Sequence, residues 1–98
     1  MEFRLDWTES ALQDLKSICD YIAIDNQDAA RRVGAEIIER AEILQHFPDL
    51  RPFYPRKTGN RYREIVFSHY RILYKTNKNK KMVQIVRIWH GTRGEPKL

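Results

Sequence analysis

The sequence has 98 residues, of which 42% are hydrophobic and 32% are charged, and its formal net charge is +5. This length fits a single domain over residues 1–98 and leaves little room for a separate cofactor domain. The composition excludes a disordered chain. The basic excess favours an anionic partner, which could be nucleic acid, an acidic protein segment or a membrane surface. Most acidic residues lie before residue 51 and most basic residues lie after it, so the second half carries the positive charge.

The sequence contains no apolar run of the roughly 20 residues that span a bilayer, and its N-terminus lacks the pattern of a signal peptide. The single cysteine, Cys19, has no partner for an internal disulfide. We therefore expect a cytosolic protein with no membrane segment, in which Cys19 packs in the core. Three scattered histidines and one cysteine lack metal-ligand spacing, which predicts neither a metal nor another cofactor.

The first half predicts a strand and two helices. Residues 2–6 alternate as a short strand, and Thr8 is a good N-cap for a helix that follows. The apolar residues of this helix recur every three or four positions and form one stripe: Ala11, Leu15, Ile18, Cys19 and Ile22.

A second helix is expected to begin at a cap provided by Asp28 and to end near Phe47 and Pro48. Its apolar stripe contains Ala30, Val33, Ile37, Ala41 and Leu44. The short polar link between the helices predicts an antiparallel helical hairpin. Gly34 stands inside the second helix, where close packing between the two helices would explain it.

The second half predicts a loop and three strands. Prolines and a glycine mark residues 51–61 as a basic loop, and strands are expected at 61–67, 70–76 and 82–89. The order β-α-α-β-β-β predicts an α+β fold, in which an N-terminal strand and a helical hairpin accompany a curved, mainly antiparallel four-stranded sheet. The helices would cover one face of that sheet, and the other face would be open to solvent or to a partner.

A two-residue turn at Ser68 and His69 would set the register of the first two strands of this meander. It pairs Phe67 with Tyr70, Val66 with Arg71 and Arg63 with Tyr74. The helix-facing set is then Ile65, Phe67, Tyr70, Ile72 and Tyr74, with Arg63 at the edge of the core, where it could meet an acid of the helices. The opposite set is Tyr62, Glu64, Val66, Arg71, Leu73 and Lys75.

Arg71 is the main candidate binding residue, because it stands on the face that the helices leave open. Tyr62, Glu64 and Lys75 share that face. A solvated charge on an exposed sheet face is the simpler explanation of Arg71, and its position is the argument for a binding role. Gly91 should bring His90 and Arg93 to the same end of the sheet. Two guanidinium groups and a histidine suit phosphate or carboxylate recognition. The face that His90 occupies stays open, because residues 82–89 do not alternate cleanly.

Four segments together resemble the RelE/ParE superfamily of bacterial toxin–antitoxin systems. They are "DLKSICDYIA", "AEILQHFP", "YREIVFSHYRILYK" and "VRIWHGTR", and they extend over nearly the whole chain. The resemblance implies a compact toxin of the bacterial cytoplasm and a co-encoded antitoxin whose flexible segment wraps it. A homodimer and a toxin–antitoxin hetero-oligomer are both compatible with the sequence.

The resemblance implies two activities. RelE-like toxins cut mRNA on the ribosome without a metal, which would make Arg71, Arg93, His90 and Tyr62 the candidate catalytic residues. ParE-like toxins poison DNA gyrase by binding and perform no bond chemistry. A third interpretation is a non-toxic domain that binds an antitoxin or nucleic acid.

Two departures from the RelE pattern favour the ParE-like interpretation. Tyr62 and Glu64 stand where the RelE pattern places lysines, and the sequence reaches Leu98 without a C-terminal catalytic tyrosine. We therefore expect a non-catalytic gyrase inhibitor from a plasmid-stabilisation type of system. Its binding residues would be Arg71, Arg93, His90, Tyr62, Glu64 and Lys75.

Overall fold

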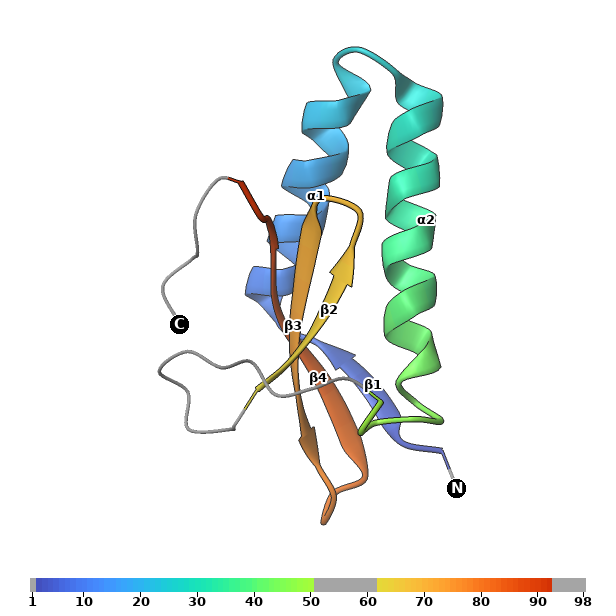
Figure 1. Cartoon of the computed structure of the whole chain (residues 1–98), viewed down its shortest axis with the longest axis vertical. Coiled ribbons are helices and arrows are strands. Elements are labelled where there is room, and N and C mark those ends of the chain that lie inside the picture. The colour runs from blue at the N-terminus through green and yellow to red at the C-terminus, as the bar shows by residue number, and fades with distance from the viewer. Residues whose placement is uncertain (1, 51–61, 93–98) are drawn as a thin grey trace.

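The computed structural model describes residues 2–50 and 62–92. Its elements, in chain order, are β1 (Arg4–Trp7), α1 (Glu9–Ala23), α2 (Gln27–Ile43), β2 (Arg63–Phe67), β3 (Tyr70–Asn77) and β4 (Met82–His90). The two helices form an antiparallel hairpin beside a sheet that is not closed (Figure 1). The predicted α+β order is confirmed, and the element ends differ from the predicted ones by a few residues.

The helix caps explain where α1 and α2 begin. Thr8 caps α1 as predicted, because its side-chain oxygen accepts a hydrogen bond from the Ala11 backbone at 3.0 Å. The predicted cap of α2 was wrong. Asn26 accepts from the Ala29 backbone at 3.0 Å, whereas Asp28 lies in the first turn and pairs with Arg31. The helix starts where a short polar side chain first reaches a free N–H group.

The sheet has the order β1-β4-β3-β2, with β1 parallel to β4 and the other neighbours antiparallel. The predicted hairpin register is confirmed, since Phe67 pairs with Tyr70, Val66 with Arg71 and Arg63 with Tyr74. Ser68 opens the two-residue turn with a φ of 55°, and hairpin turns of this length need a positive φ at that position.

A bulge in β4 accounts for the irregular sequence pattern of this strand. Leu73 pairs with Arg87, but the next residue of β3, Tyr74, pairs with Ile85, so Val86 is an extra residue in β4. The bulge lets both Ile85 and Ile88 point toward the helices. It also settles the face of His90, which pairs with Tyr70 and follows Ile88 by two residues.

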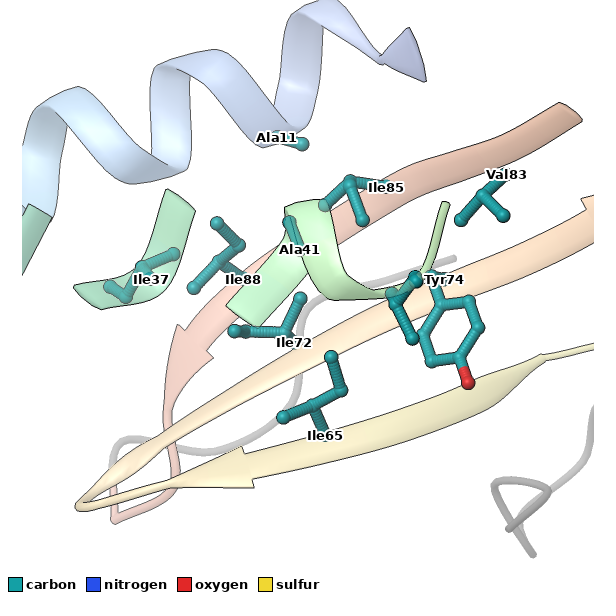
Figure 2. Packing of buried hydrophobic residues seen from close by; sticks show 10 residues of the cluster. Ala11, Ile37, Ala41, Ile65, Ile72, Tyr74, Val83, Ile85 and Ile88 are labelled. Atoms are coloured by element: carbon teal, nitrogen blue, oxygen red, sulfur yellow. The ribbon is translucent and has the colours of Figure 1, made fainter. Parts of the chain in front are cut away.

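The core lies between the helical hairpin and the sheet, where side chains from all layers converge (Figure 2). Its fully or nearly fully buried members are Ala11, Ile37, Ala41, Leu44, Ile65, Ile72, Tyr74, Val83, Ile85 and Ile88. Each buried Val, Leu or Ile side chain contributes about 1.5–3 kcal/mol relative to exposure. Since these residues come from both halves of the chain, the core fixes the sheet against both helices.

Cys19 lies between the helices and is only half-buried. The prediction that it packs in the core was therefore wrong. A Cβ atom placed on Gly34 would come within 3.0 Å of the Cys19 sulfur, so the glycine permits the close helix packing that the sequence predicted. Partial burial raises the pKa of the Cys19 thiol, and the negative charge of Asp20 adds to the effect.

The sheet face opposite the helices is less open than predicted. Leu73 is fully buried and Trp89 is only 8% exposed, and Tyr62 packs against them. Val66, on the same face, is 57% exposed. This second face therefore has a small apolar cluster at its centre and an exposed margin.

Candidate functional site

Arg71 and Glu64 meet on the second face of the sheet. They stand diagonally on neighbouring strands, since Glu64 pairs with Leu73, two residues along β3 from Arg71. Arg71 Nη1 donates to Glu64 Oε1 at 2.9 Å. The Arg71 side chain is 42% exposed, whereas the Glu64 side chain is 13% exposed. The sequence predicted the face on which both residues lie, but it did not predict that they would form an ion pair.

Gly91 forms one wall of this pair. Its backbone N–H donates to the His69 carbonyl at 2.7 Å, and a Cβ atom at this position would lie 3.2 Å from Arg71 Nε. Any larger residue would press on the guanidinium stem. Gly91, which the sequence analysis placed at the end of the last strand, thus also leaves room for the Arg71 side chain.

Tyr62 and Lys75 do not join the ion pair in a common cluster. Tyr62 packs on Leu73 and Trp89, which gives it a structural role under the site. Lys75 is exposed and stands four residues from Arg71 on β3, or about 13 Å along a strand. Of the predicted binding residues within the described ranges, only Arg71 and Glu64 are shown in contact with each other.

His90 lies on the opposite side of the sheet from Arg71. It pairs with Tyr70 while Arg71 pairs with Trp89, and successive residues of a strand point to alternate faces. The His90 ring stacks on the His69 ring with a centroid distance of 5.6 Å and meets the edge of Tyr70 at 5.3 Å. His90 and Arg71 thus share one end of the sheet but lie on opposite faces, which answers the question that the sequence left open.

The hydrogen bonds of His90 restrict its chemistry. The Thr92 backbone N–H donates to Nδ1 at 3.3 Å, and the Thr92 hydroxyl lies 2.6 Å from the same atom. Because Nδ1 accepts the backbone bond, the proton of a neutral imidazole resides on Nε2. In that neutral form Nε2 is a hydrogen-bond donor, which suits a binding contact, whereas proton transfer as an acid would require the imidazolium.

A groove beside His90 was not predicted from the sequence. It has a volume of about 170 Å³. It runs between α1 and the ends of β3 and β4, and is lined by Asp14, Ser17, Ile18, Tyr21, Tyr70, Ile88, Trp89 and His90. Aromatic residues at helical and strand positions are more often core residues than ligand contacts, so the sequence alone had no signal for it.

Asp14 anchors α1 to β4 and is a second feature that the sequence did not reveal. Its carboxylate accepts from Arg87 Nε at 2.8 Å, from Arg87 Nη2 at 3.1 Å and from the Ile88 backbone at 2.9 Å. The hydrogen bonds to Asp14 raise the pKa of Arg87, and the negative charge of Asp14 adds to this effect. Partial burial of Arg87 opposes it. This pair holds the helix beside the part of β4 that extends past β1.

Arg63 has the structural position that was predicted, with one correction. Its side chain is 16% exposed and its Nη2 lies 3.3 Å from Asp49 Oδ1. The partner was expected on a helix, but Asp49 follows the end of α2. Arg93 and the basic loop 51–61 lie outside the described residues, so the proposed arginine pair stays a prediction.

Within residues 2–50 and 62–92, no group of three His, Cys, Asp or Glu side chains is arranged to hold a metal ion. The helices of that same part of the chain are too short or too polar to cross a membrane.

A family model described as the ParE toxin of the type II toxin–antitoxin system parDE matches residues 5–94. This chain belongs to the ParE toxin family. It is accordingly a toxin of a type II toxin–antitoxin system. The match extends over both helices and all four strands.

Solved structures share the fold of this ParE-family toxin at low sequence identity. The chromosomal ParDE system from P. aeruginosa has a TM-score of 0.75 at 23% identity, covering 91% of this chain and 96% of the other. The RelBE2 toxin–antitoxin complex from Mycobacterium tuberculosis has a TM-score of 0.72 at 21% identity, and the match covers 92% of this chain and 99% of the other. The isolated E. coli RelE toxin has 0.61 at 18% identity, covering 95% and 88%.

No protein of curated function matches this chain. The structural matches include both ParE and RelE toxins, and at such identities they establish the fold that these toxins share.

Proposed function

We propose that this toxin poisons DNA gyrase by binding and is neutralised by its cognate antitoxin in the bacterial cytoplasm. Such a toxin holds gyrase and its cleaved DNA in a complex, so that growth stops when the antitoxin is lost. This behaviour would stabilise a plasmid that carries the pair. The family match over residues 5–94 supports the ParE-like branch.

The observation that carries this proposal is the state of Arg71. Cleavage of a phosphodiester needs uncompensated cations at the phosphate and a convergent acid and base. Arg71 is paired with Glu64 at 2.9 Å, and His90 stands on the other face of the sheet. Such an arrangement suits a binding surface better than a nuclease centre.

The antitoxin is the second partner. Related solved structures are of a toxin–antitoxin complex and of a ParDE system. The basic charge of this chain suits an acidic wrapping segment. The toxin would then form a hetero-oligomer with its antitoxin, and a homodimer of the free toxin stays a further proposal.

A RelE-like mRNA endonuclease is the alternative, and the groove beside His90 is the observation that favours it. As an imidazolium, His90, with Tyr70 at its edge, could donate a proton to a leaving oxygen. Arg71, Arg93 and Tyr62 would complete that proposed centre. A non-toxic domain that binds an antitoxin or nucleic acid is the remaining alternative.

Two reactions run in parallel test the proposal. The purified toxin is titrated into a gyrase supercoiling reaction and into a ribosome-dependent mRNA cleavage reaction. We expect accumulated cleaved DNA with intact mRNA, and the addition of antitoxin should reverse the effect. Cut mRNA with normal supercoiling would instead identify an endonuclease, and no effect in either reaction would favour the non-toxic domain.

A further inference from the structure

Glu64 is held close to Arg71 and is poorly accessible to solvent. One carboxylate oxygen accepts the Arg71 hydrogen bond at 2.9 Å, while Oε2 is buried and has no hydrogen-bond partner in the part of the chain that the structure describes. A carboxylate that could turn toward water would solvate this oxygen, because an unpaired buried acceptor is costly. The packing therefore fixes the carboxylate against the arginine.

Gly91 lets the Arg71 side chain lie close to the backbone while it is paired with Glu64. The Gly91 backbone lies against its stem, since a Cβ atom there would be 3.2 Å from Nε and 3.9 Å from Cδ. The Arg71 side chain is 42% exposed, and its hydrogen bond to Glu64 means that it is presented to solvent together with the negative charge of this carboxylate. A ligand that approaches Arg71 meets a pair whose net charge is zero.

We propose that Glu64 is the specificity-determining residue of this site and excludes phosphodiester backbones from Arg71. A phosphate in contact with the exposed edge of the guanidinium would stand about 6 Å from the carboxylate. At an effective dielectric between those of a protein surface and water, this repulsion weakens binding by about tenfold. Arg71 is consequently reserved for a partner group that does not carry the charge density of a nucleic-acid backbone.

This inference uses Arg71 as the recognition residue, as the proposed function does, but its test requires no gyrase. The probe is a fluorescent single-stranded oligonucleotide of about 12 residues, and binding is followed by anisotropy at several salt concentrations. The variants are Glu64→Gln, the double variant Glu64→Gln/Arg71→Gln, and Glu39→Gln. Glu39 is exposed on α2, which packs on the other face of the sheet, so its substitution makes the same change in net charge on a different element.

Glu64→Gln should bind the oligonucleotide about tenfold more tightly than the wild type, and its salt dependence should steepen by about one released ion. Glu39→Gln should change the affinity by less than about twofold. The double variant should lose the gain, because the freed guanidinium causes it. An affinity of Glu64→Gln equal to that of Glu39→Gln, or a gain that persists in the double variant, would overturn the proposal.

A measurement on the wild type keeps the test valid if Glu64→Gln does not fold. The side-chain Nε–H resonance of Arg71 is followed by NMR while the same oligonucleotide is added. We expect this resonance to stay in place while backbone resonances of any other contact surface shift. A shift of the Arg71 resonance with the same midpoint would show that phosphate reaches the arginine despite Glu64. Either outcome is independent of whether gyrase is the target.

Discussion

The helix-facing side of the sheet buries Ile65, Ile72 and Tyr74 almost completely, whereas the opposite side combines an ion pair with the small Leu73–Trp89 cluster. The first face is continuous with both helices, so its side chains contribute mainly to stability. On the second face, Arg71 is partly exposed and Glu64 is nearly buried. The charged residues of one hairpin differ in exposure and in partner because they alternate between these faces.

The largest expected effect comes from a cavity on the helix-facing side. Ile72→Ala removes a fully buried side chain and should lower the free energy of unfolding by about 2–5 kcal/mol. Val66→Ala is the matched control on the second face, where the side chain is 57% exposed, and should cost less than about 1 kcal/mol. Urea denaturation measures both. Similar losses would mean that the two faces do not differ in packing.

The anchor between α1 and β4 should give the next largest effect. Asp14→Ala removes both hydrogen bonds from Arg87 and the acceptor of the Ile88 backbone. Because both side chains are partly exposed, we expect a loss of about 1–3 kcal/mol. Lys16→Ala, which breaks an exposed pair on the same helix, is the control. An Asp14→Ala protein as stable as this control would contradict the assigned role.

Arg63 lies in the same hairpin as Arg71 but is more deeply buried. Arg63→Ala removes a largely buried stem and a contact with the half-exposed Asp49. We expect a loss of about 1 kcal/mol in thermal or chemical unfolding with target binding retained. Full stability with loss of binding would place the recognition residue on the helix-facing edge instead.

Cys19 should show the smallest effect. Its raised pKa means that the folded state holds the thiol proton more tightly than the unfolded state. This stabilising contribution is complete below the unfolded pKa and is lost as the pH rises through the folded one, so stability should decline slightly above about pH 9. Alkylation by iodoacetamide near pH 8 should be several times slower in the folded protein than in urea. Equal rates would show that the thiol is not shielded.

The sequence predicted those parts of the fold that depend on short-range patterns. The Thr8 cap and the hairpin register follow from spacing along the chain and were confirmed. Most members of the two predicted helix stripes pack in the core or against it. The cap at Asn26 was missed because several polar residues compete within one short link. The bulge at Val86 was missed because one extra residue cancels the alternation on which the strand prediction depended.

The candidate site was predictable only in part. The register placed Arg71 and Glu64 on one face, but their ion pair depends on side-chain conformation, which spacing does not determine. His90 was separated from Arg71 by the bulge. The contacts of Asp14 with Arg87 and Ile88 join residues more than 70 positions apart, so no local sequence pattern could predict them.

The central claim is that Arg71, on the second face, mediates binding to the target. The most direct measurement is the amount of gyrase-cleaved DNA that accumulates with the wild type and with Arg71→Ala, after both proteins have shown the same thermal midpoint. We expect accumulation with the wild type and a loss of about tenfold or more in potency for Arg71→Ala. Equal accumulation with the two proteins at equal concentration would contradict it.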